Sequence, residues 1–384
     1  MSTQFTTAKC AIMGESALIN SGEQIAKIGK NALIITGKHI TQSGILKQLT
    51  DLLIDNSVAF SVFNDITGEP TDEMIVASVE SYKKGNCDFI IGIGGGSPLD
   101  SAKACAAMSV LPGVISDYAE KEILGDFPPV VLIPTTSGTG SEVTKFTIIT
   151  DTKTDVKMLL KGEALLPTLA IIDPSLSYSA PKNVTSATGI DALTHAVEAY
   201  TSKKATPVTD VFALSAIKRI FKYLPTAYED GANKKAREEM AIAAYEAGLC
   251  INNSSVTVVH GMSRPIGALF HVPHGFSNAM LIVPCLEYAV DGCYSRFADI
   301  ARAIGAADDE IDDKDAADLF LVELKKLIKA VEIPSLVEYG IDRSTFIESS
   351  DKMATDALAS GSPSNTRKKL EKKDILEVYK NALI

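Results

Sequence analysis

Short apolar runs alternate with longer, helix-sized segments through the first half of the chain. The runs are rich in β-branched and aromatic residues, and they are ALIIT (32–36), VAFSVF (58–63), DFIIGI (88–93), VVLIP (130–134) and TLAIID (168–173). Runs of this length, apolar on both faces, are typical of parallel strands covered by helices on both sides. The pattern predicts an α/β nucleotide-binding domain with a parallel, Rossmann-like sheet.

The pattern changes from about residue 185, where Ala, Leu, Glu and Lys dominate and strand-like runs become rare. Examples are DALTHAVEAY (191–200) and KKAREEMAIAAYEAGLC (234–250), which predict an all-α second half. Pro174 and Pro181 bracket a Ser-rich connector between the two patterns. A chain of 384 residues also exceeds the usual size of a single hydrophobic core. We therefore expect two domains, residues 1–180 and 181–384.

Composition narrows the class of protein. The formal net charge of -11 argues against a nucleic-acid partner, which clustered Lys and Arg would bind. No basic and apolar leader opens the sequence, and no apolar run reaches the length of a membrane span. The six cysteines form no C-x-x-C pair and are typical of buried thiols in a reducing compartment. We expect a cytoplasmic protein that binds neither nucleic acid nor membrane.

A glycine-rich turn, GIGGGSPLDSAKA (92–104), follows the run at 88–93. Glycines 94–96 allow positive φ and leave no Cβ in the way of a ligand. Ser97 as N-cap, Pro98 at the first helical position and Asp100 in a capping box predict a helix that begins at Ser97. The free N–H groups of such a helix end attract phosphate. The alternative is a tight turn that binds no ligand.

A second loop, IPTTSGTGSEVTKF (133–146), follows the run at 130–134 and carries several hydroxyls. In a parallel sheet both loops leave the carboxyl ends of neighbouring strands, where ligands bind. The pair of loops predicts a site for a pyrophosphate between two sugars, against the alternative of a Ser/Thr-rich surface loop. The hydroxyls belong to Thr135, Thr136, Thr139 and Thr144.

Histidines gather in HGMSRPIGALFHVPHG (260–275), which holds three of the five in the chain. Asp191 and His195 are four residues apart on a predicted helix, a spacing that by itself also fits a surface pair. Together with His260 and His274 they supply one carboxylate and three imidazoles, donors that suit Fe²⁺ or Zn²⁺ rather than Mg²⁺ or Ca²⁺. We expect His271 to lie nearer the wall of the substrate pocket.

These motifs, in this order and spacing, make the chain resemble the iron-containing, or group III, alcohol dehydrogenases over essentially its whole length. The resemblance rests on GGGSPLDSAKA, IPTTSGTGSEVT, GIDALTHAVEAY and the segment H-x13-H-G. It implies a dinucleotide domain, a helical metal-binding domain and an active site in the cleft between them. It also implies NAD or NADP as cofactor and a homodimer or larger assembly.

Carried over by position, the resemblance assigns roles to individual residues. It makes Asp191, His195, His260 and His274 the ligands of the metal, most simply Fe²⁺ with Zn²⁺ as the alternative. Gly95, Gly96 and Ser97 would bind the pyrophosphate, with Asp100 one helical turn behind them. The remaining cofactor positions are Thr135, Thr136, Thr139, Thr144 and, at the ribose, Lys157.

Two departures from the family pattern matter. Many NAD-dependent members carry an aspartate after the first main strand that bonds the ribose, and this chain has Gly37 followed by Lys38, which leaves NAD against NADP open. Arg264 replaces a histidine four residues after His260. Arginine stays protonated and cannot relay a proton, so His271, cofactor hydroxyls or water would have to do so.

The expected reaction is hydride transfer between nicotinamide and a short-chain aldehyde or primary alcohol polarised by the metal. Arg264 either pairs with a protein carboxylate or grips an anionic substrate tail, as in sulfoacetaldehyde or a semialdehyde. A neutral short-chain alcohol or diol is the alternative substrate. An NAD- and metal-dependent lyase of the dehydroquinate synthase type and a non-enzymatic nucleotide-binding protein are the alternatives from other classes.

Overall fold

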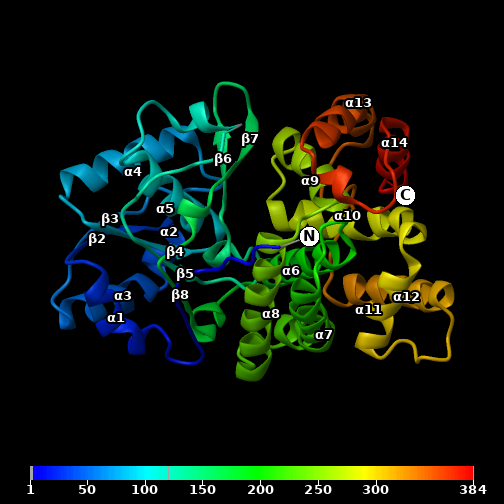
Figure 1. Cartoon of the computed structure of the whole chain (residues 1–384), viewed down its shortest axis with the longest axis horizontal. Coiled ribbons are helices and arrows are strands. Elements are labelled where there is room, and N and C mark those ends of the chain that lie inside the picture. The colour runs from blue at the N-terminus through cyan, green and yellow to red at the C-terminus, as the bar shows by residue number, and fades with distance from the viewer. Residues whose placement is uncertain (1–2, 120, 384) are drawn as a thin grey trace. The chain divides into compact units, whose positions relative to one another are not determined.

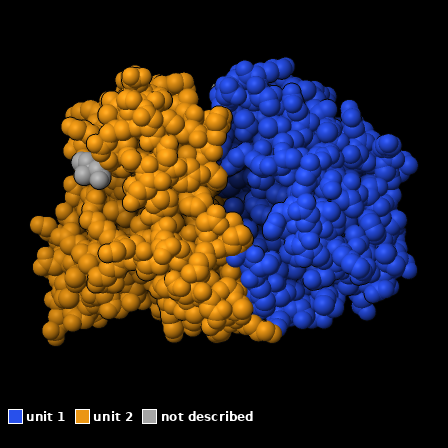
Figure 2. Space-filling model, turned by 180° about the vertical axis from the view of Figure 1, so that it is seen from behind, with its two compact units in different colours: residues 1–180 blue, residues 181–384 orange. Residues whose placement is uncertain are grey.

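The computed structural model describes residues 3–119 and 121–383. The chain divides into two compact units, residues 1–180 and 181–384, coloured separately in Figure 2. Within the described ranges, no helix combines the length and the apolar character that a membrane span requires.

The first unit is built on a six-stranded parallel sheet with the strand order β1-β8-β5-β4-β2-β3. Its strands are β1 (Ala11–Met13), β2 (Asn31–Ile35), β3 (Ala59–Phe63), β4 (Phe89–Gly94), β5 (Val130–Pro134) and β8 (Leu169–Ile172). All five runs singled out in the sequence form strands of this sheet. The predicted α/β unit with a parallel sheet is confirmed.

Helices cover both faces of the sheet, as the doubly apolar strands require (Figure 1). The helices of this unit are α1 (Gly22–Ile28), α2 (Lys38–Gln42), α3 (Ile45–Asp55), α4 (Asp72–Lys84) and α5 (Gly96–Met108). Alternate strand residues point to opposite faces: Leu33 packs in one core with α4 and α5, and Ile34 in the other with α1 and α3. Two cores therefore sandwich one sheet.

An antiparallel hairpin of β6 (Phe146–Asp151) and β7 (Val156–Lys161) adds a small second sheet that the sequence analysis did not predict. It packs beside α5, which is buried along most of its length. β1 was missed as well, because a strand of three residues at the sheet edge carries almost no periodic signal.

The second unit is helical, as predicted. Its helices are α6 (Lys182–Thr201), α7 (Pro207–Glu229), α8 (Lys234–Asn253), α9 (Val258–Leu269), α10 (His274–Ala289), α11 (Tyr294–Ile304), α12 (Asp313–Ala330), α13 (Arg343–Ala359) and α14 (Lys372–Asn381). Helix α6 packs against α7, α8 and α10 and is buried nearly all round. A helix of this kind presents its few polar side chains to the interior, so Asp191, His195 and Glu198 lie inside the unit.

Candidate metal centre and nucleotide loops

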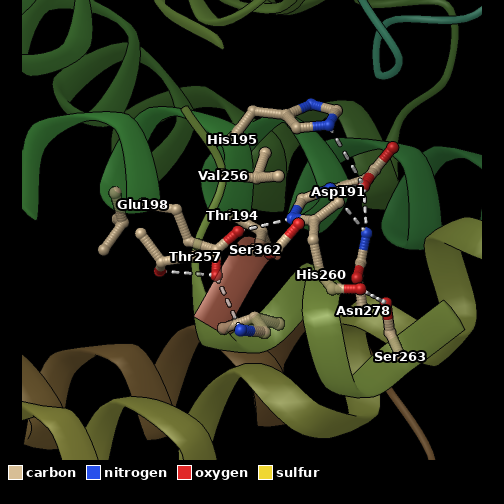
Figure 3. A network of polar contacts seen from close by, with 12 residues as sticks. Asp191, Thr194, His195, Glu198, Val256, Thr257, His260, Ser263, Asn278 and Ser362 are labelled. Carbon is tan, nitrogen blue, oxygen red and sulfur yellow. Dashed lines mark hydrogen bonds and ion pairs between the residues drawn. The ribbon is translucent and has the colours of Figure 1, made fainter. Parts of the chain in front are cut away.

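The second unit brings together the four residues that the sequence proposes as metal ligands. Asp191 and His195 lie one turn apart on α6, His260 lies in the first turn of α9, and His274 begins α10. One potential donor atom from each lies within 4.8 Å of all the others. Figure 3 shows Asp191, His195 and His260 at this point.

The spacing of the donor atoms fits one metal ion. Oδ1 of Asp191 lies 3.9 Å from Nε2 of His195 and 3.7 Å from Nε2 of both His260 and His274. A tetrahedral ion with bonds of about 2.1 Å separates its ligand atoms by about 3.4 Å. Small inward movements of the side chains would therefore close the set around an ion.

Burial prepares these groups for that role. Asp191, His195 and His260 are at most 4% exposed, and burial lowers the pKa of His260 well below its usual value. Burial alone would raise the pKa of Asp191, but His195, the other two imidazoles and a hydrogen bond from Asn278 outweigh it and lower this pKa. A metal binds carboxylates and neutral imidazoles, and the lowered pKa values of Asp191 and His260 favour these forms at those two residues.

Asn278, one turn after His274 on α10, places its amide nitrogen among the donor atoms. Nδ2 lies 2.7 Å from Oδ1 of Asp191, 3.0 Å from Nε2 of His260 and 3.2 Å from Nε2 of His274. Its own Oδ1 is buried without a hydrogen-bond partner among the described residues. The NH₂ group of Asn278 thus lies among three potential acceptor atoms, a place where a cation could also be bound.

Behind His260 lies Glu198, a fully buried carboxylate on α6. Its Oε2 is 2.5 Å from Nδ1 of His260, on the far side of the ring from Asp191. Its Oε1 accepts from the Thr257 hydroxyl at 2.8 Å and from the Val259 N–H at 2.6 Å. Burial raises the pKa of Glu198 against these hydrogen bonds, which favour the ionised form.

Arg264 lies one helical turn after His260 on α9 and is partly buried. Its Nη1 donates to the Ser362 hydroxyl at 3.0 Å, and its buried Nε has no hydrogen-bond partner among the described residues. Within the same residues it forms no ion pair at contact distance, although Glu198 acts on it at longer range. Burial lowers the pKa of Arg264, and the charge of Glu198 opposes this shift. The protein carboxylate that the sequence offered as one partner is therefore not in contact.

His271 lies outside the metal cluster, in the loop between α9 and α10. It is exposed and has a φ of 53°, a left-handed conformation that non-glycine residues seldom adopt. The loop conformation thus presents this imidazole to solvent.

In the first unit, the glycine turn differs from the prediction in its capping. Helix α5 begins at Gly96 with Gly95 as its N-cap, and no side chain caps it. The predicted Ser97 cap and Asp100 capping box are wrong, because with this earlier start Asp100 falls in the second turn. Its carboxylate instead accepts from the Ser141 hydroxyl at 2.5 Å and from the Ile148 N–H at 2.9 Å.

The glycines of the turn do face the second loop. A Cβ on Gly96 would approach the Thr139 methyl group to 2.8 Å, and one on Gly95 would lie 3.7 Å from the Thr136 hydroxyl. Gly94 has a φ of 146°. Strands β4 and β5 are parallel neighbours, so both loops leave the same edge of the sheet. The arrangement has the glycines, the helix end and the hydroxyls that a pyrophosphate site requires.

A buried lysine holds the second loop against α5. Nζ of Lys103 donates to the carbonyl oxygens of Ser141 at 3.0 Å and of Thr144 at 3.4 Å, and also to that of Phe146. Its ammonium is also 3.4 Å from the Thr144 hydroxyl and from Asp100 Oδ1. Burial lowers the pKa of Lys103. Asp100 and Thr144 thus have partners within the protein in this structure, whereas Thr135 lies buried at the end of β5 beside Gly94.

Two further residues proposed for the cofactor lie in the same unit. Gly37 is the N-cap of α2, and a Cβ there would come within 2.8 Å of the Ile66 carbonyl oxygen. Lys157, on β7, forms an ion pair of 3.3 Å with Glu69. Glu69 precedes Thr71, whose hydroxyl caps α4.

Sequence reasoning missed Glu198, Asn278 and Lys103. A signal existed for Glu198, since residues 191, 195 and 198 follow the helical spacing of i, i+4 and i+7 and share one face of α6. Asn278 has the same i+4 relation to His274. For Lys103 there was no signal, because a lysine on a helix normally lies in solvent.

Comparison with known proteins agrees with this architecture. The family described as iron-containing alcohol dehydrogenase matches residues 9–174, and the C-terminal part of the Fe-containing alcohol dehydrogenase family matches residues 185–383. The chain is 35% identical to the NAD-dependent methanol dehydrogenase of Bacillus methanolicus over 99% of its own length and 100% of that protein.

Solved structures give the same picture. A 1,3-propanediol oxidoreductase superposes with a TM-score of 0.95 at 33% identity and covers 100% of both chains. The sulfoacetaldehyde reductase of Bifidobacterium kashiwanohense in complex with NAD⁺ superposes with a TM-score of 0.88 at 26% identity and covers 100% of this chain and 99% of that one.

The fold and these matches define an oxidoreductase of the alcohol dehydrogenase class. This chain belongs to the iron-containing alcohol dehydrogenase family. Membership decides against the lyase and the non-enzymatic alternatives, and it implies NAD(H) and a divalent metal as cofactors.

Proposed function

We propose that the protein is a metal-dependent NAD(P)(H) aldehyde reductase and alcohol dehydrogenase for short substrates that carry an anionic tail. The observation that carries the chemistry is the convergence of Asp191, His195, His260 and His274 on one point in the second unit. These four residues would hold the metal, which we propose to be Fe²⁺, with Zn²⁺ as the alternative that the same donors accept.

When bound, the metal supplies Lewis acidity to the carbonyl or alcohol oxygen, and nicotinamide supplies or accepts the hydride. We assign the pyrophosphate to Gly95, Gly96 and Ser97, because they lie at the start of α5, where backbone N–H groups lack partners within the helix, and because Gly95 leaves room for close approach. Thr135, Thr136 and Thr139 are proposed cofactor contacts from the facing loop. Thr144 and Lys157 would contribute only by exchanging their present partners.

Gly37 and Lys38 leave the choice between NAD and NADP to experiment. No carboxylate stands at residue 37 to repel a 2′-phosphate. Initial rates with NADH and with NADPH at equal concentration measure this preference directly.

The anionic tail is proposed from Arg264. Its guanidinium lies one turn from His260, lacks a contact ion pair among the described residues and keeps one buried N–H without a partner. Its charge reaches the metal cluster, since it contributes to lowering the pKa of His260. A guanidinium can bind a sulfonate or carboxylate with two parallel hydrogen bonds. The similarity to a sulfoacetaldehyde reductase supports this substrate class, whereas the similarity to a methanol dehydrogenase supports the neutral alternative.

With Arg264 unable to relay a proton, we propose His271 for that role. It is exposed in the loop before α10, and an imidazole has one nitrogen that can donate a proton and one that can accept it.

The decisive test measures kcat/KM for sulfoacetaldehyde and for propanal, with matched metal content, in the wild type and in two variants. A hydrogen bond to a charged group contributes about 1.5–3 kcal/mol. Arg264→Ala should therefore lower kcat/KM for the anionic aldehyde about tenfold to a hundredfold and change that for propanal far less. Arg264→Lys should recover only part of the loss, since it keeps the charge without the two-pronged geometry. If Arg264→Ala lowered kcat/KM equally for both aldehydes, the anionic substrate class would be contradicted and the neutral class would be favoured.

A further inference from the structure

Both carboxylate oxygens of Glu198 have hydrogen-bond partners within the protein: Oε1 has the Thr257 hydroxyl and the Val259 N–H, and Oε2 has Nδ1 of His260 (Figure 3). The Val259 N–H can only donate, and it meets Oε1 together with the Thr257 hydroxyl. Val259 occupies the second position of α9, whose N-terminal N–H groups lack partners within the helix. One oxygen of Glu198 thus caps α9 from the neighbouring helix α6.

The other oxygen meets Nδ1 of His260 at 2.5 Å. A carboxylate only accepts, so in the neutral imidazole this contact requires the proton on Nδ1 and leaves the lone pair on Nε2. The contacts at Nε2 agree, since the Asn278 amide nitrogen donates toward it at 3.0 Å. Nε2 is also the ring nitrogen that faces Asp191, at 3.7 Å from its Oδ1.

We infer that Glu198 is a positioning residue that fixes His260 in the tautomer whose Nε2 can ligate the metal. The inference rests on the proposed function, because it concerns how the proposed metal site is prepared. The carboxylate of Glu198 would act through His260, since its hydrogen bonds go to Thr257, Val259 and Nδ1 of His260. A carboxylate behind a ligating imidazole orients the ring and raises its basicity, and loss of such a partner typically weakens metal binding about 10- to 100-fold.

A plain helix cap would use only Oε1, and Glu198→Gln separates the two roles. Glutamine has one acceptor oxygen and one donor nitrogen. The donors Val259 N–H and Thr257 hydroxyl on one side favour the amide oxygen there, which turns the NH₂ group toward Nδ1 of His260. Nδ1 must then accept, and the ring proton moves to Nε2, the atom that the metal needs. The cap is kept and the tautomer is reversed.

The experiment uses the full-length protein, freed of metal and titrated with Zn²⁺ against a chromophoric chelator. We expect E198Q to bind Zn²⁺ about 10- to 100-fold more weakly than the wild type, with the melting temperature of the metal-free protein little changed. The matched control is E246Q, which alters another largely buried carboxylate of the same unit that pairs with Ser215 and Arg219. It should leave Zn²⁺ affinity unchanged.

A second readout follows the tautomer itself. Protein labelled with ¹⁵N-histidine contains five imidazoles, so long-range ¹H–¹⁵N spectra resolve which ring nitrogen carries the proton. The metal-free wild type should show His260 protonated on Nδ1, and E198Q should show it protonated on Nε2. A wild-type spectrum with the proton on Nε2 would overturn the inference even if E198Q did not fold.

The other outcomes separate the two proposals. Unchanged Zn²⁺ affinity and tautomer in E198Q would leave Glu198 as a cap and overturn the inference. An equal loss of Zn²⁺ affinity in E198Q and E246Q would show that both substitutions act through the general stability of the unit. That result would also overturn the inference. A wild type that binds no Zn²⁺ at these residues would contradict the proposed function instead.

Discussion

Gly95 and Gly96 are adjacent residues with different reasons to be glycine. At Gly96 the space for a Cβ is already taken by the Thr139 methyl group at 2.8 Å, so the requirement comes from the protein's own packing. At Gly95 a Cβ would meet nothing closer than 3.7 Å, and its φ of -72° suits any residue. A demand for glycine at 95 can therefore come only from a ligand.

We expect Gly95→Ala to fold with an unchanged melting temperature and to bind NADH at least tenfold more weakly, because the new methyl group would occupy the proposed pyrophosphate position. Gly96→Ala should lower the melting temperature as well, since Thr139 must move. Fluorescence titration with NADH and thermal unfolding measure the two effects. Normal NADH affinity in Gly95→Ala would place the pyrophosphate elsewhere.

At the scale of elements, helix α5 organises the nucleotide loops through two side chains on its inner face. Lys103 gathers three backbone carbonyls of residues 141–146, and Asp100 binds Ser141 and the backbone of β6. These bonds are buried, so removal of the ammonium would take a buried donor from each carbonyl, and the Ser141 oxygen would keep only its two 3.4 Å contacts from Thr144. The loop that faces the glycine turn thus depends on a helix side chain that is fully buried.

Lys103→Met should destabilise the first unit by about 3–5 kcal/mol, the usual cost of breaking a buried ion pair from one side. For a unit of this size the melting temperature should fall by about 6 °C or more. Lys47→Met is the control, since Lys47 is exposed and pairs with Asp51 only across one helical turn. It should change the melting temperature by less than about 2 °C. If both variants lowered the melting temperature equally, Lys103 would not be the residue that holds the loop.

The elements that sequence could predict were those with a strong periodic signal. Apolar runs of five or six residues predicted five strands of the parallel sheet, and three of the four proposed donors stood out because histidine is rare in the chain. The β6–β7 hairpin was missed although TIIT and VKMLLK flank a turn-like DTKTD segment, because each arm has only six residues and is only partly buried. The Ser97 cap was wrong because a preference for serine at an N-cap is weaker than the geometry of three glycines.

The partners of the site residues could not be read from sequence for a different reason. Glu198 and His260 are 62 positions apart, and Arg264 and Ser362 are 98 apart. A contact at such separation is decided by how α6, α9 and the turn at 362–365 pack, which no local pattern encodes. Sequence therefore proposed the four donors, whereas the residues that support them could be found only in the structure.

At the scale of the whole molecule, each cofactor is assigned to residues of a single unit. The four metal donors belong to residues 181–384, and the glycine turn and hydroxyl loop belong to residues 1–180. Each unit has its own hydrophobic core. A substitution in one unit should therefore impair either metal binding or nucleotide binding, and should leave the other intact.

Asp191→Ala and His274→Ala should each abolish turnover and reduce metal content to background, while NADH affinity stays within about threefold of the wild type. Metal analysis and fluorescence titration of the same samples make the comparison. Gly95→Ala is the reciprocal control and should keep its metal. Full metal content in either ligand variant would show that the donors are wrongly assigned, and loss of NADH binding in both would show that the units do not act separately.

The order of the site residues along the chain also sets the order in which they are synthesised. At synthesis rates of about 5–20 residues per second, the 62 positions between Glu198 and His260 correspond to about 3–12 s. Until α9 and α10 have been made, Asp191, His195 and Glu198 have neither their imidazole partners nor the helix that Glu198 caps. The first unit ends at residue 180, before the first proposed metal donor is translated, so it can fold first. The ion that binds would then be one that is available when α9 and α10 pack against α6.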